Sequence, residues 1–334
     1  MAFSLGLALV AFALGAVFGP IWVRFLRAQN LGKQLNPSEP EEHRVKEGTP
    51  TMGGAIFVAP IIGVTLAFQA LFGGRPAMLG PVALAAACAV LGAYDDFQTL
   101  VGRSQRSAGL PPGVKWGVEL MLCLGAGLAL ALAGHTRVHV PFAGWFSWTG
   151  WVYVPFATLV LLSTINGVGI TDGLDGLAAT TGAIAFAAFW IIGLLHGDPA
   201  TAALCGTVVG GLLAYLWFNA YPAQVFMGDT GSLPLGALLG IVALLLGEPF
   251  LLIPIGVVYV ANVVSDILQV ASNKLTRKRM FRYAPLHHHF RRPQVKDTWV
   301  TWPRQPWPEV WVVQRFWIAG AVGALAGLLL AILG

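Results

Sequence analysis

Ten apolar segments divide this 334-residue sequence, and polar stretches separate them. The segments cover residues 3–23, 52–72, 78–96, 115–134, 150–166, 177–196, 200–218, 232–247, 249–271 and 312–333. A helix that crosses a bilayer needs about 20 mostly apolar residues, so most of these segments have the required length. Charged residues make up only 10% of the chain, against roughly 25% in soluble domains. We therefore predict an all-α polytopic membrane protein with about ten transmembrane helices, forming a single domain over residues 1–334.

The basic residues predict the orientation of these helices. The first of them is Arg24, after the first apolar segment, which is typical of a permanent anchor and not of a cleaved signal peptide. With the N-terminus outside, the cytoplasmic segments are residues 24–51, 95–115, 167–176, 219–231 and 272–315. Of 20 lysines and arginines, only Arg75 and Arg137 then lie outside, as the positive-inside rule requires. Both termini are thus predicted on the periplasmic side. The basic residues form no single patch, so we expect no nucleic-acid partner.

Five aspartates lie at the predicted cytoplasmic ends of helices or in short cytoplasmic loops: Asp95, Asp96, Asp172, Asp175 and Asp229. The adjacent pair Asp95 and Asp96 would repel at a membrane boundary unless a cation or a basic partner lay between them. Hard oxygen ligands of this kind suit Mg²⁺, which carboxylates and substrate phosphates usually hold together. A solvated helix end is the alternative interpretation of this pair taken alone.

Two glycine-rich segments carry the other aspartates. Residues 166–176 contain four glycines, which let a backbone approach a ligand closely. Asp172 and Asp175 would share a face if this segment were helical, although a flexible loop with helix caps is the plainer interpretation. Asp229 lies in a Gly-Asp-Thr-Gly-Ser turn, which predicts either a helix N-cap or a site for a metal–phosphate complex.

Two further segments carry polar side chains that suit phosphate. His287, His288 and His289 are consecutive in the last long cytoplasmic loop. A zinc site is disfavoured because no cysteine is near and three consecutive histidines cannot easily reach one metal, so phosphate contacts or proton transfer fit better. Lys46 and Thr51 lie in a Lys-Glu-Gly-Thr-Pro-Thr segment that could contact phosphate. All these clusters map to one membrane face, which predicts a common active site there.

Several of these strings together resemble the phospho-N-acetylmuramoyl-pentapeptide transferase family, within the polyprenyl-phosphate N-acetylhexosamine-1-phosphate transferase superfamily. The resemblance runs nearly end to end. It rests on KEGTPTMGG at 46–54, DD at 95–96, TDGLDGLA at 171–178, VFMGDTGS at 225–232, FRYAPLHHHF at 281–290 and RFW at 315–317. The TPTMGG and APLHHHF strings favour the muramoyl branch over the GlcNAc-1-phosphate branch.

The resemblance implies a Mg²⁺-dependent enzyme of the bacterial inner membrane, and a homodimer. It would transfer phospho-MurNAc-pentapeptide from UDP-MurNAc-pentapeptide to undecaprenyl phosphate, giving lipid I and UMP. A UDP-GlcNAc donor is the nearest alternative. A membrane transporter is a more distant one, because transporters place polar sites near the bilayer midplane.

The resemblance also implies roles for individual residues. Asp229 would be the main Mg²⁺ ligand, Asp95 the base or a covalent nucleophile, and Asp96 a support for the metal or the lipid phosphate. Substrate contacts would come from Lys46, Thr51, Asn166, Asp172, Asp175 and Asn219. His288 and His289 would contact phosphate or sugar, with His287 adjacent.

The sequence departs from the family pattern at a few positions. Thr99 stands where a lysine is usual, and Arg103, Arg106 or Lys115 are candidates to supply the missing charge. Gly169 replaces an asparagine, Asn262 a glutamate and Asp266 an apolar residue. The loop from 291 to 306 is longer than in the family.

Overall fold

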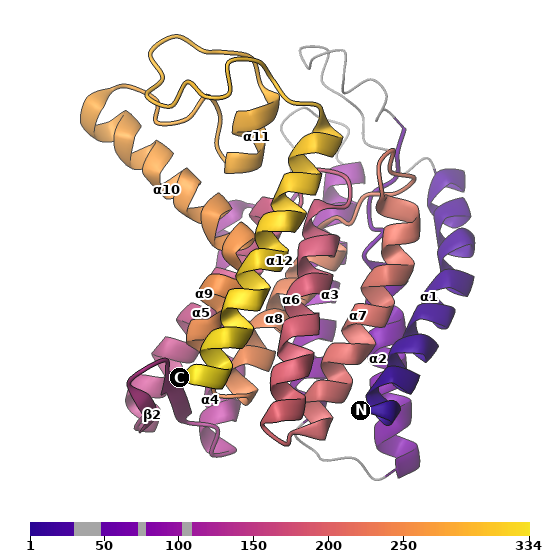
Figure 1. Cartoon of the computed structure of the whole chain (residues 1–334). Coiled ribbons are helices and arrows are strands. Elements are labelled where there is room, and N and C mark those ends of the chain that lie inside the picture. Colours follow the sequence, from indigo (N-terminus) through magenta and orange to yellow (C-terminus); the bar gives the residue numbers. More distant parts are fainter. Residues whose placement is uncertain (30–47, 73–77, 102–108) are drawn as a thin grey trace.

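The structure is a computed structural model that describes residues 1–29, 48–72, 78–101 and 109–334. It is a bundle of helices with one small hairpin (Figure 1). The long helices are α1 (Ala2–Ala28), α2 (Ala55–Phe72), α3 (Leu79–Val101), α4 (Pro112–Leu132), α5 (Gly150–Thr171), α6 (Leu177–Leu195), α7 (Pro199–Asn219), α8 (Asp229–Leu245), α10 (Val257–Thr276) and α12 (Glu309–Leu333). The short elements are η3 (Pro249–Leu251), α9 (Leu252–Ile255), α11 (Leu286–Arg291) and the strands β1 (Arg137–Val140) and β2 (Gly144–Ser147).

Each of the ten predicted apolar segments is helical. Seven helices within the described residues are long and apolar enough to cross a membrane, or eight if the bent pair of 249–255 and 257–276 is one span. The other two segments, α2 and α8, are apolar but shorter. Large apolar side chains stay exposed around the bundle, such as Leu9 and Val17 at 69% each. Such a surface is stable against lipid tails and not against water, so the fold is that of a polytopic membrane protein.

Helix α8 is the centre of the bundle. Every residue from Thr230 to Leu244 is buried, and the helix packs mainly against α3 and α5. The outer helices bury much less of their length, which matches their predicted contact with lipid. Because α8 is enclosed on all sides, its first residue, Asp229, is held at a fixed place at one end of the bundle. We call this the α11 end, and both chain termini lie at the opposite end (Figure 1).

The chain breaks sharply between α9 and α10, which meet at 86°. Proline and glycine flank this break, at Pro254 and Gly256, and neither residue favours a continuous helix. Two glycines of α12 let it pack closely on α9: a Cβ at Gly323 would lie 2.2 Å from the Pro254 carbonyl oxygen. Beyond the break α10 leans away from the bundle, and the loop after it returns over the α11 end (Figure 1).

The hairpin of β1 and β2 was not predicted from the sequence. Its strands pair antiparallel from Arg137 with Ser147 to Val140 with Gly144. The backbone N–H of His139 donates to the Gly247 carbonyl at 2.7 Å, so the hairpin is fixed to the turn after α8. Four-residue strands of mixed polarity give little periodic signal, which is why the segment between two apolar runs predicted only a loop.

Candidate active site

The carboxylate of Asp96 caps the N-terminus of α8. Its Oδ1 accepts a hydrogen bond from the backbone N–H of Asp229 at 3.1 Å. Its Oδ2 accepts from the backbone N–H of Thr230 at 3.0 Å and from the Thr230 hydroxyl at 2.6 Å. A side chain of α3 thus satisfies N–H groups that the first helical turn leaves without partners. Asp96 is only 8% exposed, so the structure gives it a positioning role toward Asp229.

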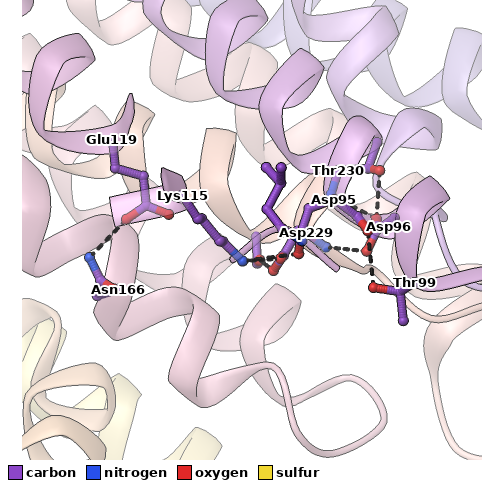
Figure 2. A network of polar contacts seen from close by, with 10 residues as sticks. Asp95, Asp96, Thr99, Lys115, Glu119, Asn166, Asp229 and Thr230 are labelled. Carbon is purple, nitrogen blue, oxygen red and sulfur yellow. Dashed lines mark hydrogen bonds and ion pairs between the residues drawn. The ribbon is translucent and has the colours of Figure 1, made fainter. Parts of the chain in front are cut away.

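Lys115 lies between the carboxylates of Asp95 and Asp229 (Figure 2). Its ammonium group is 3.2 Å from Oδ2 of Asp95 and also contacts Oδ2 of Asp229. Asp95 accepts a second hydrogen bond from the backbone N–H of Leu110 at 2.6 Å. Two carboxylates from α3 and α8 therefore share one lysine from α4, and the positive charge reduces their mutual repulsion.

This arrangement bears on the departure at Thr99. The Thr99 hydroxyl donates to the backbone carbonyl of Asp95 at 3.0 Å and brings no charge to the site. Lys115, one of the residues suggested to compensate, is placed at the carboxylates themselves. The other two, Arg103 and Arg106, lie outside the described residues, as does Lys46.

The segment with Thr51 packs directly on the start of α8. The N–H groups of Gly53 and Gly54 donate to the carbonyls of Phe226 and Met227 at 2.8 and 2.9 Å. A Cβ at Gly54 would lie 2.2 Å from the Cα of Gly231, so only glycine permits this approach. Thr51 is consequently held beside the Gly228–Asp229 turn, where a Cβ at Gly228 would lie 2.6 Å from the Thr51 hydroxyl. Its contact with substrate stays a prediction.

Asp172 lies among the other acids. Helix α5 continues to Thr171, so the predicted loop from residue 166 begins later than expected. The Asp172 carboxylate accepts from the backbone N–H of Gly228. Burial, followed by the charges of Asp229, Asp96 and Asp175, raises the pKa of Asp172 to about 8. Such crowding of carboxylates makes the site favourable for a cation.

Asp175 and Asn219 connect the glycine-rich segment 166–176 to residues 219–225, which lie just before the Asp229 turn. The Asp175 carboxylate accepts from the Ala223 N–H at 3.0 Å. The Asn219 amide accepts from the Gly176 N–H and donates to the Val225 carbonyl, both at 2.9 Å. These side chains are each 4% exposed, so they hold the walls of the predicted nucleotide-sugar site in place.

Glu119 was missed in the sequence analysis, although a lone acid inside an apolar segment is a signal of function. It lies on α4 one turn after Lys115 and is 3% exposed. Its Oε2 accepts from the side-chain amide of Asn166 at 3.4 Å (Figure 2). Asn166, predicted to lie near the substrate, is thus connected to the helix that carries Lys115.

Two of the three histidines are used inside the protein. His289 is 1% exposed; its Nδ1 accepts from the Arg282 N–H at 3.1 Å, and its Nε2 donates to the Trp302 carbonyl at 2.8 Å. Burial lowers the pKa of His289, so this imidazole is neutral near pH 7. No ring nitrogen remains for the predicted contact with phosphate or sugar. We therefore correct its role: His289 orders the loop from residue 282 to residue 302.

His287 is also buried, beside the glycine-rich loop. Its backbone N–H and its Nδ1 both lie near the Asn262 amide oxygen, at 3.2 and 3.1 Å. Its Nε2 faces Gly173, where a Cβ would lie 2.4 Å away. Burial, followed by His288 and Arg291, lowers the pKa of His287. His288 is the partly exposed member of the three, and its contact with phosphate or sugar stays a prediction.

The described residues contain no group of three or more histidine, cysteine, aspartate or glutamate side chains arranged to hold a metal. Asp229 offers one carboxylate that is partly exposed, with the Ser232 hydroxyl 3.4 Å from its Oδ1. This donor set fits a hard cation that a carboxylate and substrate phosphates hold together, and it does not fit a metal held by protein alone.

Comparison with known proteins agrees with this geometry. The sequence profile of glycosyl transferase family 4 matches residues 78–247, and signature 1 of the phospho-N-acetylmuramoyl-pentapeptide-transferases matches residues 46–58. The phospho-N-acetylmuramoyl-pentapeptide-transferase of Chloroflexus aurantiacus is 39% identical over 347 aligned residues, covering 100% of this chain and 90% of the relative. That of Moorella thermoacetica is 39% identical over 94% of both chains.

The chain belongs to the phospho-N-acetylmuramoyl-pentapeptide-transferase family. A third relative, from Shouchella clausii, is 37% identical and covers 97% of this chain and 96% of its own. Membership confirms the resemblance drawn from the sequence strings. The matched signature includes Thr51, Gly53 and Gly54, the residues that dock on the start of α8.

Proposed function

We propose that this protein transfers phospho-MurNAc-pentapeptide from UDP-MurNAc-pentapeptide to undecaprenyl phosphate, giving lipid I and UMP. The observation that carries the proposal is near-complete alignment with relatives named for this activity. The site at the α11 end supports it, because Asp95, Asp229 and Lys115 converge there from three helices. A membrane-embedded fold suits an enzyme whose acceptor is a lipid.

The reaction balances as a single displacement. An oxygen of the lipid phosphate forms a bond to the sugar-linked phosphorus of the donor, and the bond from that phosphorus to the bridging oxygen breaks. UMP leaves with the bridging oxygen. Phosphoryl transfer between two anions depends mainly on positioning and on neutralisation of charge.

The described residues supply positioning and charge. Asp95 is the candidate base for the acceptor phosphate, and Lys115 holds it toward Asp229. Asp96 holds the first turn of α8 and so fixes Asp229. Asp229 would be the ligand of Mg²⁺, whose chemistry when bound is to neutralise charge on the pyrophosphate and on the leaving UMP. His288 would contact the donor.

The remaining parts of the proposal concern location and assembly. We place the α11 end at the cytoplasmic face of the bacterial inner membrane and both termini on the periplasmic side. The uneven distribution of lysine and arginine supports this orientation. A homodimer is part of the proposal through family likeness alone.

Release of UMP by purified protein in detergent tests the function. The mixture contains undecaprenyl phosphate, Mg²⁺ and either UDP-MurNAc-pentapeptide or UDP-GlcNAc. We expect release with the muramoyl donor only, loss on chelation, and recovery when Mg²⁺ is restored. Release with UDP-GlcNAc alone would reassign the donor. No release with either donor, from protein shown to be folded, would overturn the proposal.

A further inference from the structure

A cavity borders the loop that carries His288. It measures about 400 Å³ and lies between α10 and residues 279–284. Its lining comprises Asp266, Gln269, Val270, Asn273, Arg279, Arg282, Tyr283 and Ala284. Ala284 precedes His288 by four residues, and Asp266 follows Asn262, which contacts His287, by one helical turn. The cavity is therefore next to the candidate active site, and none of the residues discussed for catalysis lines it.

Asp266 and Arg279 carry opposite charges in this cavity, and neither forms an ion pair with a residue that the structure describes. Asp266 makes no hydrogen bond or ion pair with any residue that the structure describes. Arg279 donates one weak hydrogen bond, at 3.4 Å to the Arg282 carbonyl, and lies 5.8 Å from the Tyr283 ring. The Arg282 guanidinium is different, because it is fully buried and donates to the Gln294 side chain and to backbone carbonyls.

The cavity walls are fixed before any ligand arrives. The side-chain amide of Gln269 bonds both the N–H and the carbonyl of Phe281, at 2.8 and 3.2 Å, which ties the loop to α10. The Arg279 backbone pairs with residues 297 and 299, within the long loop that departs from the family pattern. A cleft of a few hundred Å³ with preset polar groups is typical of a small-molecule site.

We propose that this cavity binds the zwitterionic head group of a diamino dicarboxylic acid, as found at the third position of a donor peptide. The ammonium group would meet Asp266, and the carboxylate would meet Arg279. A lone carboxylate and a guanidinium across one cavity match the two charges of an α-amino acid head group. Three extended residues span up to about 10 Å, so the third residue of the donor peptide can reach a cavity that adjoins the sugar site.

The inference rests on the proposed function and names a specificity determinant for it. The test uses three donors that differ only at the third residue: diaminopimelate has both charged groups, lysine has the ammonium alone, and Nε-acetyl-lysine has neither. For the wild-type protein we expect KM to rise about threefold to tenfold with each group lost. The effect falls on KM and not on kcat, because neither Asp95 nor Asp229 lines the cavity.

Two variants separate the two contacts. Asp266→Asn should abolish the KM difference between the lysine and acetyl-lysine donors. Arg279→Gln should abolish the difference between the diaminopimelate and lysine donors. Asp297→Asn is the matched control, an acid-to-amide change in another cavity of the same loop, and it should leave all three KM values unaltered.

Each outcome decides something different. Equal KM values for the three donors with wild-type protein would overturn the inference and leave the proposed function intact. A KM difference between the lysine and acetyl-lysine donors that persists in Asp266→Asn would also overturn it. Failure to release UMP from any donor would instead count against the proposed function.

Discussion

Asp96 on α3 accepts a hydrogen bond from the backbone N–H of Asp229, the first residue of α8, at 3.1 Å. The adjacent aspartates Asp95 and Asp96 of α3 therefore have different roles. Asp95 faces Lys115, whereas Asp96 turns its carboxylate to the end of another helix. Separate partners offset the expected repulsion between the two carboxylates. Asp95 has the lysine, and Asp96 has the N–H groups at the start of α8.

Replacement of Asp96 by asparagine should lower both the stability of the protein and its kcat. The amide turns an NH₂ group toward one set of donors, the Asp229 N–H or the N–H and hydroxyl of Thr230. A lost buried hydrogen bond of this kind costs about 1–3 kcal/mol. We expect a lower Tm in detergent and a drop in kcat of at least tenfold. An unchanged Tm with lost activity would contradict the capping role.

Asp229→Ala should abolish UMP release without lowering Tm. The side chain is partly exposed, and its removal leaves the Asp96 capping bonds to the α8 backbone intact. Thermal unfolding and UMP release on the same preparation check both halves of the prediction. Near-normal turnover would show that Asp229 is not the metal ligand.

Gly92→Ala should disrupt the site through a steric clash alone. A Cβ at Gly92 would lie 2.0 Å from the Asp229 carbonyl oxygen, so α3 and the start of α8 would have to separate. Gly80 lies on the same helix and has open space where its Cβ would be. We expect Gly92→Ala to lower Tm and activity sharply, and Gly80→Ala to keep both. Similar behaviour of the two variants would mean that α3 and α8 can separate freely.

The apolar segments predicted the helices well because lipid imposes a length and a composition that a sequence displays directly. The boundaries at polar ends were less accurate. Helix α5 continues through Gly167 and Gly169 to Thr171, since these glycines face neighbouring helices. A Cβ at Gly167 would lie 3.6 Å from Tyr259 on α10, and a Cβ at Gly169 would lie 3.9 Å from the Ser232 hydroxyl on α8. Glycine alone indicates a loop, and only the tertiary contact shows otherwise.

The site was predictable as a set of residues and not as a set of roles. Short motifs placed Asp95, Asp229 and Asp175 at one end of the bundle. Nothing in the spacing of His287, His288 and His289 shows that Asn262 and Trp302 occupy the first and third imidazoles. Such partners come from segments distant in sequence, so only the fold separates the buried histidines from the accessible one.

Lys115→Met should cost far more activity than Lys115→Arg. Methionine fills similar space without charge and leaves the Asp95 and Asp229 carboxylates without the positive charge that lies between them. Arginine keeps the charge but places it in a wider, planar group. We expect a loss of kcat of about 100-fold or more for methionine and a smaller loss for arginine. The comparison is made at saturating Mg²⁺, and equal losses would show that charge is not the property that matters.

His289→Gln should remove part of the acid sensitivity of the fold. Burial lowers the folded-state pKa of His289, so the unfolded chain binds this proton more readily. The free energy of unfolding then falls as pH drops below about 6.5, the unfolded value, and it is fully retained above that value. Glutamine can accept from the Arg282 N–H and donate to the Trp302 carbonyl, and it does not titrate. Tm measured between pH 5 and pH 8 should therefore vary less in His289→Gln than in the wild type. Parallel curves for the two proteins would show that His289 stays neutral in the unfolded chain or charged in the folded one.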